Sequence, residues 1–116
     1  MTKNSTFRAG AATADISPAT SQFLYGYPHV ERWSTGLHDP LTSSALALDD
    51  GKTCLIFIAN DILYVQKSIV ARARQRISRA TGVPEGHIMI TATHTHSGPV
   101  VSNRGPGSYD NVVPDA

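Results

Sequence analysis

The sequence predicts a small α/β fold, in which a β-hairpin and a strand–helix–strand unit form one mixed sheet. Asp49-Asp50-Gly51 separates two apolar runs, a pattern typical of a hairpin turn. Apolar residues recur with helical spacing over residues 65–80. A β-branched run over residues 87–92 follows this helix after a short turn.

The elements follow one another in a clear order. Residues 7–16 predict a first strand of small side chains that ends at Ser17-Pro18. Residues 19–40 predict a long loop, punctuated by glycine and proline and rich in aromatic residues. A loop of this length within a compact domain is often functional. Residues 43–48 and 52–60 predict the two hairpin strands.

One face of the predicted helix is apolar, and the glycine after it marks its end. The apolar positions are Val65, Ile69, Val70, Ala73 and Ile77. Gly82 occupies the usual place of a C-terminal cap, and residues 83–86 form a turn before the last strand. Residues 100–116 show no periodicity, so we expect a loop or disordered tail there.

The strand–helix–strand order predicts that residues 53–60 and 87–92 run parallel. Ligands of such sheets gather at the carboxyl ends of the strands, where Asp61 and the segment His94-Thr95-His96 both fall. Two interpretations of Asp61 remain open. Its carboxylate either supports a ligand histidine from the second coordination shell or caps the following helix.

The pentad His94-Thr95-His96-Ser97-Gly98 is the most informative motif. On an extended backbone residues i and i+2 face the same side, so His94 and His96 would share one space. Paired imidazoles suit zinc, whose catalytic sites use three protein ligands and a water. Thr95 and Ser97 could bond to a ligand histidine's other nitrogen or to substrate. The alternative is that these histidines are ordinary strand-end groups.

His38 is a weaker candidate, which either lines the same pocket or hydrogen-bonds within its own turn. His29 and His87 are expected to be ordinary exposed or half-exposed groups. Cys54 is the only cysteine, which excludes an internal disulfide, and its apolar strand predicts an inert thiol in the core.

Length and composition predict a single globular domain. The chain has 116 residues, 41% of them hydrophobic and 16% charged. The net charge of +1 gives no electrostatic reason to expect a nucleic-acid partner. The arginines at 72, 74, 76 and 79 are expected to form a solvated helix face. No secretory signal or membrane-spanning stretch is visible, so a soluble cytoplasmic chain is expected.

Five segments of the chain carry a family resemblance. They are Ala9–Pro18, Tyr25-Gly26-Tyr27, Gly36–Leu41, the hairpin Ala45–Gly51 and the run Ile90–Pro99, whose Ala-Thr-His-Thr-His-Ser-Gly-Pro stretch is the most specific element. In order and spacing the region of residues 8–99 resembles the amino-terminal part of the neutral/alkaline non-lysosomal ceramidase family, and most closely its short bacterial members.

The resemblance implies a zinc amidase that cuts ceramide into sphingosine and a fatty acid. By the same resemblance His94 is a zinc ligand, and His96 lies beside the metal and contacts the substrate, with Ser97 next to it. The other ligands of the family, a second histidine, a glutamate and a tyrosine, and its catalytic serine come from later segments. Ser17 matches the family's first strand and is not read as the nucleophile.

Residues 1–116 are therefore expected to be a partial amino-terminal ceramidase-like domain with an incomplete zinc site, a lipid amide substrate and no activity alone. The alternative is a small non-catalytic α/β binding module or a gene remnant, and a third is another metal hydrolase that shares only this sheet. A small sheet with an open edge also predicts self-association.

Overall fold

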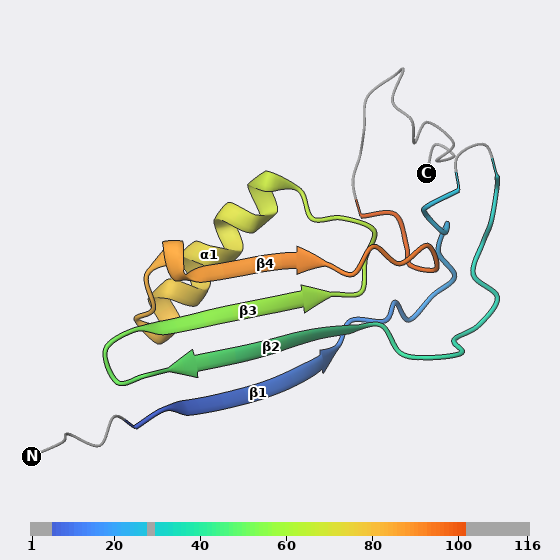
Figure 1. The fold of residues 1–116 in the computed structure, drawn as a ribbon. Helices are drawn as coiled ribbons and strands as arrows, with labels where there is room; N and C mark the ends of the chain where they lie inside the picture. The colour runs from blue at the N-terminus through green and yellow to red at the C-terminus, as the bar shows by residue number, and fades with distance from the viewer. Residues whose placement is uncertain (1–5, 28–29, 102–116) are drawn as a thin grey trace, which may run out of the picture.

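The computed structural model describes residues 6–27 and 30–101. A four-stranded mixed sheet carries one α-helix on one face (Figure 1). The strands lie in the order β1-β2-β3-β4, antiparallel except for the parallel pair β3–β4. The elements are β1 (Arg8–Asp15), β2 (Thr42–Asp49), β3 (Cys54–Asn60), α1 (Lys67–Thr81), the 3₁₀ turn η1 (Glu85–His87) and β4 (Ile88–Ala92). The predicted fold class is confirmed.

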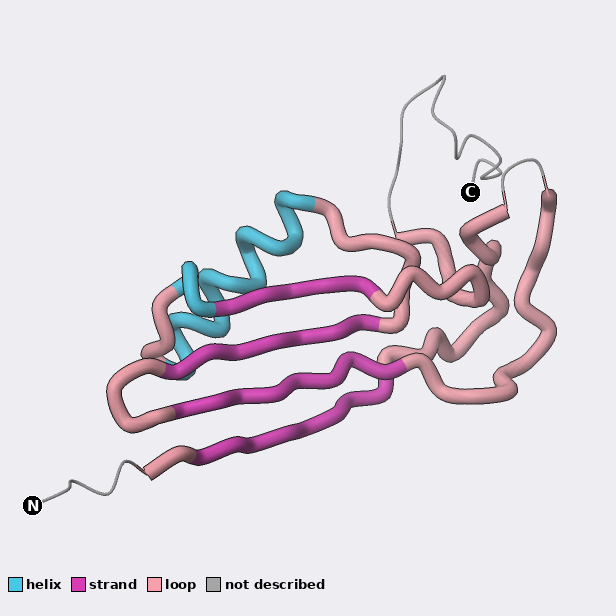
Figure 2. Tube along the Cα trace, in the orientation of Figure 1, coloured by secondary structure: helices cyan, strands magenta, loops and turns pink. Residues whose placement is uncertain are grey.

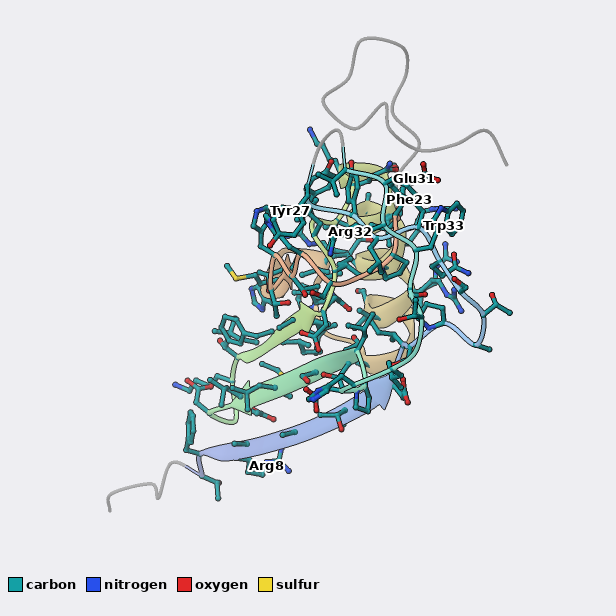
Figure 3. The ribbon with its side chains drawn as sticks, turned by 90° about the vertical axis from the view of Figure 1, so that its right-hand side faces the viewer. Arg8, Phe23, Tyr27, Glu31, Arg32 and Trp33 are labelled. Atoms are coloured by element: carbon teal, nitrogen blue, oxygen red, sulfur yellow. The ribbon has the colours of Figure 1, made fainter. Side chains whose placement is uncertain are left out.

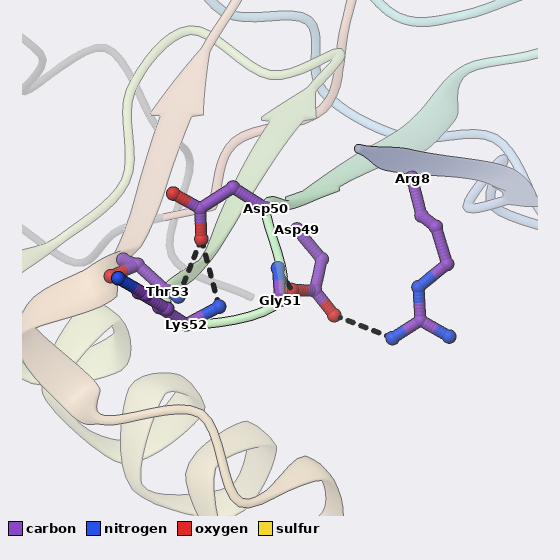
Figure 4. Close-up of polar contacts among 6 residues, drawn as sticks. All are labelled: Arg8, Asp49, Asp50, Gly51, Lys52 and Thr53. Carbon is purple, nitrogen blue, oxygen red and sulfur yellow. Dashed lines mark hydrogen bonds and ion pairs between the residues drawn. The ribbon is translucent and has the colours of Figure 1, made fainter. Parts of the chain in front are cut away.

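The Asp-Asp-Gly turn between β2 and β3 forms as predicted (Figure 4). Asp49 accepts a hydrogen bond from the Gly51 N–H at 2.7 Å, and Gly51 has a φ of 89°. Asp50 accepts from the N–H groups of Lys52 and Thr53 at 2.9 and 2.8 Å. These backbone N–H groups are the main reason that the pKa values of both carboxyls are lowered. Arg8 pairs with Asp49 at 2.9 Å and joins β1 to this turn.

Helix α1 ends where the sequence predicts and begins two residues later than predicted. Gly82 adopts a left-handed φ of 76°, and its N–H donates to the Ser78 carbonyl at 2.8 Å. The N-cap residue is Gln66, so the interpretation of Asp61 as the helix cap is wrong. A bend and an irregular stretch through residue 66 separate Asp61 from the first turn, which puts its carboxylate out of reach of the free N–H groups.

The core lies between α1 and the β3–β4 half of the sheet. Ile56, Val83 and Ile88 are its buried centre, and Ile77 of the helix packs against them. Arg74 is half-buried and donates from Nε to the Ile88 carbonyl at 2.7 Å, whereas the other three helix arginines are exposed as expected. Cys54 is half-buried beside this cluster, less buried than the prediction of a core thiol implies.

The other face of the sheet has no covering layer among the described residues (Figure 1). Leu46, Phe57 and Met89 stand in register across β2, β3 and β4 on this face, with 41%, 37% and 53% of their surfaces exposed. Every residue of β1 is exposed. No helix in the described ranges is long and apolar enough to span a bilayer.

The carboxyl ends of β3 and β4 meet at the end of the sheet that also carries the long loop (Figure 2). Asn60 pairs with Ala92, and beyond them the Thr93 and His94 N–H groups donate to the carbonyls of Asn60 and Ile62 at 2.9 and 3.1 Å. The prediction that Asp61 and the His-Thr-His segment share one end of the sheet is confirmed.

Candidate functional site

The two histidines are adjacent, although not for the predicted reason. β4 ends at Ala92, and His94 has a left-handed φ of 66°, so the extended backbone assumed for residues 94–96 is wrong. The β4 ladder stops because its partner β3 ends at Asn60 and leaves the sheet. The left-handed turn still brings the imidazoles together, with ring centroids 5.1 Å apart and planes at 69°.

The orientation of the His94 ring is set by a backbone carbonyl. Its Nδ1 lies 2.8 Å from the carbonyl oxygen of Leu63, a residue only 5% exposed. A carbonyl can only accept, so Nδ1 carries a proton, and in the neutral imidazole Nε2 keeps its lone pair. The predicted bond from Thr95 or Ser97 to this nitrogen is not what the structure shows, because the Thr95 hydroxyl accepts from the Ser97 N–H at 3.2 Å.

The His96 side chain packs tightly against residues of the long loop. A Cβ added to Gly26 would lie 2.7 Å from Cγ of His96, and Gly26 has a φ of 119°. Only glycine accepts both the backbone angle and the contact. The ring of Tyr27 meets the His96 ring edge-on, with centroids 5.1 Å apart at 81°. Gly26 and Tyr27 therefore restrict the His96 side chain.

The long loop has more order than the sequence predicts. Phe23 and Trp33 form an isolated antiparallel bridge, and their rings meet edge-on at 5.5 Å. The Tyr25 N–H donates to the Gly98 carbonyl at 3.0 Å, and the hydroxyls of Tyr25 and Tyr64 are hydrogen-bonded to each other. In Figure 3 the labelled loop residues lie together in the upper part of the view, far from Arg8. The loop is thus fastened to the histidine segment.

Arg32 joins this loop to the histidine segment. Its guanidinium donates to the carbonyl of His96 at 2.7 Å and to that of Tyr25 at 3.3 Å. The same group lies 4.4 Å from the centroid of the Tyr27 ring. Sequence reasoning missed Arg32 and assigned no role to Gly26 or Tyr27. The only available indication was the Tyr-Gly-Tyr motif inside an aromatic-rich loop.

A cavity of about 1050 Å³ lies against the same strand ends. The alternate residues Thr93, Thr95 and Ser97 line it, whereas His94 and His96 do not. His38 and Asp61 line the cavity too, and the exposed His38 ring contacts its neighbour Asp39 at 2.8 Å. The cavity thus takes in Ser97, His38 and Asp61 but not the two histidines.

Asp61 is bonded to threonines in the structure. One carboxylate oxygen accepts from the N–H and hydroxyl of Thr42 at 2.8 and 3.0 Å, and the other accepts from the Thr93 hydroxyl at 3.0 Å. The Thr42 N–H is the largest cause that lowers the pKa of this carboxyl. Asp61 thus ties β2 to the chain after β4.

The donors present suit a metal ligand but not a whole site. A ligand histidine commonly donates its other N–H to a carbonyl or carboxylate, as His94 does to Leu63. Across residues 6–27 and 30–101, no three His, Cys, Asp or Glu side chains gather into a metal-binding group. The described residues can therefore offer His94, and at most its neighbour His96, to a zinc ion.

Comparison with known proteins matches residues 7–104 to the family model described as neutral/alkaline non-lysosomal ceramidase, N-terminal. The chain belongs to the neutral/alkaline non-lysosomal ceramidase family. The matched region covers all of residues 8–99, over which the sequence resemblance was expected. It includes the His-Thr-His segment and the loop that packs against His96.

Known ceramidases resemble this chain in sequence and in fold. The neutral ceramidase of Pseudomonas aeruginosa PAO1 is 26% identical over 98 residues, which are 80% of this chain and 15% of that protein. A structure of a ceramidase complexed with C2 superposes with a TM-score of 0.71 at 25% identity, over 81% of this chain and 15% of the other. The crystal structure of the Pseudomonas aeruginosa neutral ceramidase gives 0.72 at 24% identity, over 84% and 16%. This chain thus spans about a sixth of each of these ceramidases.

Proposed function

We propose that this chain supplies two active-site histidines, His94 and His96, of a zinc-dependent amidase. The enzyme would hydrolyse the N-acyl bond of a ceramide-like lipid to a sphingosine-like amine and a fatty acid. The observation that carries the proposal is the bond from His94 Nδ1 to the buried Leu63 carbonyl, which leaves Nε2 available to a metal. Family membership supports the same assignment.

His94 would hold the zinc, with other ligands supplied from outside the described residues. Zinc in such a site polarises the substrate carbonyl and lowers the pKa of a bound water. His96 would donate a hydrogen bond to the oxygen on which charge develops during amide cleavage. This role suits a ring already restricted by Gly26 and Tyr27, because a preorganised donor need not reorient during the reaction.

The proposal is tested in a chimera, in which residues 7–104 replace the matching segment of the Pseudomonas neutral ceramidase. Zinc content and turnover of a fluorescent ceramide are measured. We expect the chimera to keep both and the His94→Ala variant to lose both. His87→Gln is the matched control, because His87 directly precedes the first residue of β4, at the opposite end of the strand from His94. This variant should keep both zinc and turnover.

A His94→Ala chimera that retains its zinc would overturn the proposal. Circular dichroism and thermal melting first establish that each chimera is folded. If the parent chimera does not fold, a shorter graft of residues 85–99 takes its place. It carries the same two variants, and zinc content is again expected for the parent graft and His87→Gln and not for His94→Ala.

One observation favours a second candidate, a non-catalytic binding module. The apolar row of Leu46, Phe57 and Met89 offers a contact surface remote from any catalytic chemistry. Calorimetry separates the two candidates. An absence of zinc uptake by the folded parent chimera, with no difference from His94→Ala, would favour the binding module.

A further inference from the structure

We propose that Arg32 is the positioning residue of His96, fixing its backbone so that its imidazole keeps one orientation beside His94. The inference rests on the proposed function, since it explains how the substrate-facing histidine is held ready. Arg32 reaches across from the long loop, far from His96 in sequence, and takes no part in holding His94.

Three contacts of one guanidinium carry the argument. The group donates to the His96 carbonyl at 2.7 Å, the shortest of its contacts, and to the Tyr25 carbonyl at 3.3 Å. It also lies over the face of Tyr27, 4.4 Å from the ring centroid. Arg32 therefore fixes both the His96 backbone and the ring against which the His96 side chain packs.

The geometry around His96 makes the backbone contact decisive for the side chain. Gly26 lies directly against Cβ and Cγ of His96, and the Tyr27 ring packs against the His96 imidazole from a second side. A rotation of the His96 peptide would move Cβ against these neighbours or away from them. The hydrogen bond from Arg32 holds that peptide in the orientation at which the ring fits.

The two histidines have separate supports, which makes the proposal selective. The His94 ring is oriented by the Leu63 carbonyl, and the His94 backbone N–H donates a hydrogen bond to the Ile62 carbonyl. His96 is oriented by Arg32, Gly26 and Tyr27. Loss of the guanidinium should therefore loosen His96 and leave the tautomer of His94 unchanged.

The chemistry of the position requires arginine. A planar guanidinium can donate to two carbonyls in its plane while its face lies on an aromatic ring. Both carbonyls accept from one guanidinium nitrogen, so a lysine ammonium with its three donors could bond to them, but it cannot reproduce the flat contact with Tyr27. Arg32→Lys should consequently restore part of what Arg32→Gln loses.

Nuclear magnetic resonance of the 116-residue chain, labelled with ¹⁵N at histidine, tests the inference. We expect a nuclear Overhauser effect between the His96 and Tyr27 rings, lost in Arg32→Gln and partly retained in Arg32→Lys. The ¹⁵N shifts of His94 should keep the pattern of a proton on Nδ1 in all variants. Arg76→Gln, at an exposed arginine of α1, is the matched control and should change neither histidine.

Two results would overturn the inference. An unchanged His96–Tyr27 effect in a folded Arg32→Gln chain would show that Arg32 does not hold the ring. An equal change at His94 and His96, or a collapsed amide spectrum, would show general loosening of the segment. In the chimera, Arg32→Gln should lower turnover by about tenfold to a hundredfold with zinc content unchanged. The resonance result does not depend on zinc, so failure of the proposed function would leave it standing.

Discussion

The Nδ1 atom of His94 lies 2.8 Å from the backbone carbonyl oxygen of Leu63, the buried residue of the segment between β3 and α1. A segment that leaves one strand thus fixes the tautomer of a histidine that follows the neighbouring strand. His94 adopts a left-handed φ of 66°, an uncommon conformation for a residue with a side chain. Such strained residues recur at functional sites, where the surrounding structure holds them.

The two histidines should respond differently to removal in the chimera. His94→Ala should abolish zinc content and turnover together. His96→Ala should leave most of the zinc and lower turnover roughly 10²–10³-fold, the loss typical of an oxyanion donor. Metal analysis and kinetics on both variants check this. Loss of zinc from the His96 variant alone would reverse the two roles.

The 116-residue chain alone should hydrolyse no lipid amide, because its described residues gather no third metal ligand beside the two histidines. The measurement is turnover of a fluorescent ceramide with zinc added, beside the chimera as positive control. Turnover above the buffer blank that disappears in His94→Ala would contradict the prediction.

Gly26→Ala should destabilise the chain and displace His96. The added Cβ would stand 2.7 Å from Cγ of His96, at a backbone φ of 119°. Gly51→Ala is the matched control, because Gly51 also has a positive φ of 89° but open space around it. We expect a loss of roughly 1 kcal/mol for Gly51→Ala and a clearly larger loss for Gly26→Ala in urea unfolding. Equal losses would mean that the contact with His96 is not tight.

Asp61 should make folding stability depend on acid pH. Hydrogen bonds from Thr42 and Thr93 lower its pKa from 3.8 in the folded state, so its contribution is present above that value and lost as pH falls through the folded pKa. Asp61→Asn should therefore be less stable than the parent at pH 7, with the gap closing below about pH 4. Urea unfolding across this range measures the gap, and exposed Glu85→Gln serves as the control. A gap that stays constant with pH would contradict the assignment.

The uncovered sheet face should cause self-association of the 116-residue chain. Apart from Asp15 at the end of β1, this face carries only uncharged side chains across the four strands, and β1 leaves an open edge. Light scattering should give a mass above the 12.4 kDa of one chain. Phe57→Lys should lower that mass, whereas Ile69→Lys on α1, also 37% exposed, should not. A monodisperse monomer at high concentration would contradict the prediction.

The elements that the sequence predicted depend on interactions between neighbours along the chain. Asp49, Asp50 and Gly51 close their turn with their own side chains and backbone, and Gly82 ends the helix through its own left-handed conformation. The parallel pair of strands follows from the strand–helix–strand order. The family was recognisable because the His-Thr-His segment and its companions keep their order along the chain.

The geometry of the site was decided by contacts between residues far apart in sequence. Gly26 lies against His96, Arg32 binds the His96 carbonyl, and Leu63 orients His94. No local period encodes these contacts, because each depends on where a long loop closes over the strand ends. The sequence by itself determined the sheet, the helix and the identity of the two histidines. Only the tertiary structure decided their ring orientations and separated them from the cavity, since a side chain's direction follows from packing between segments rather than from the residues beside it.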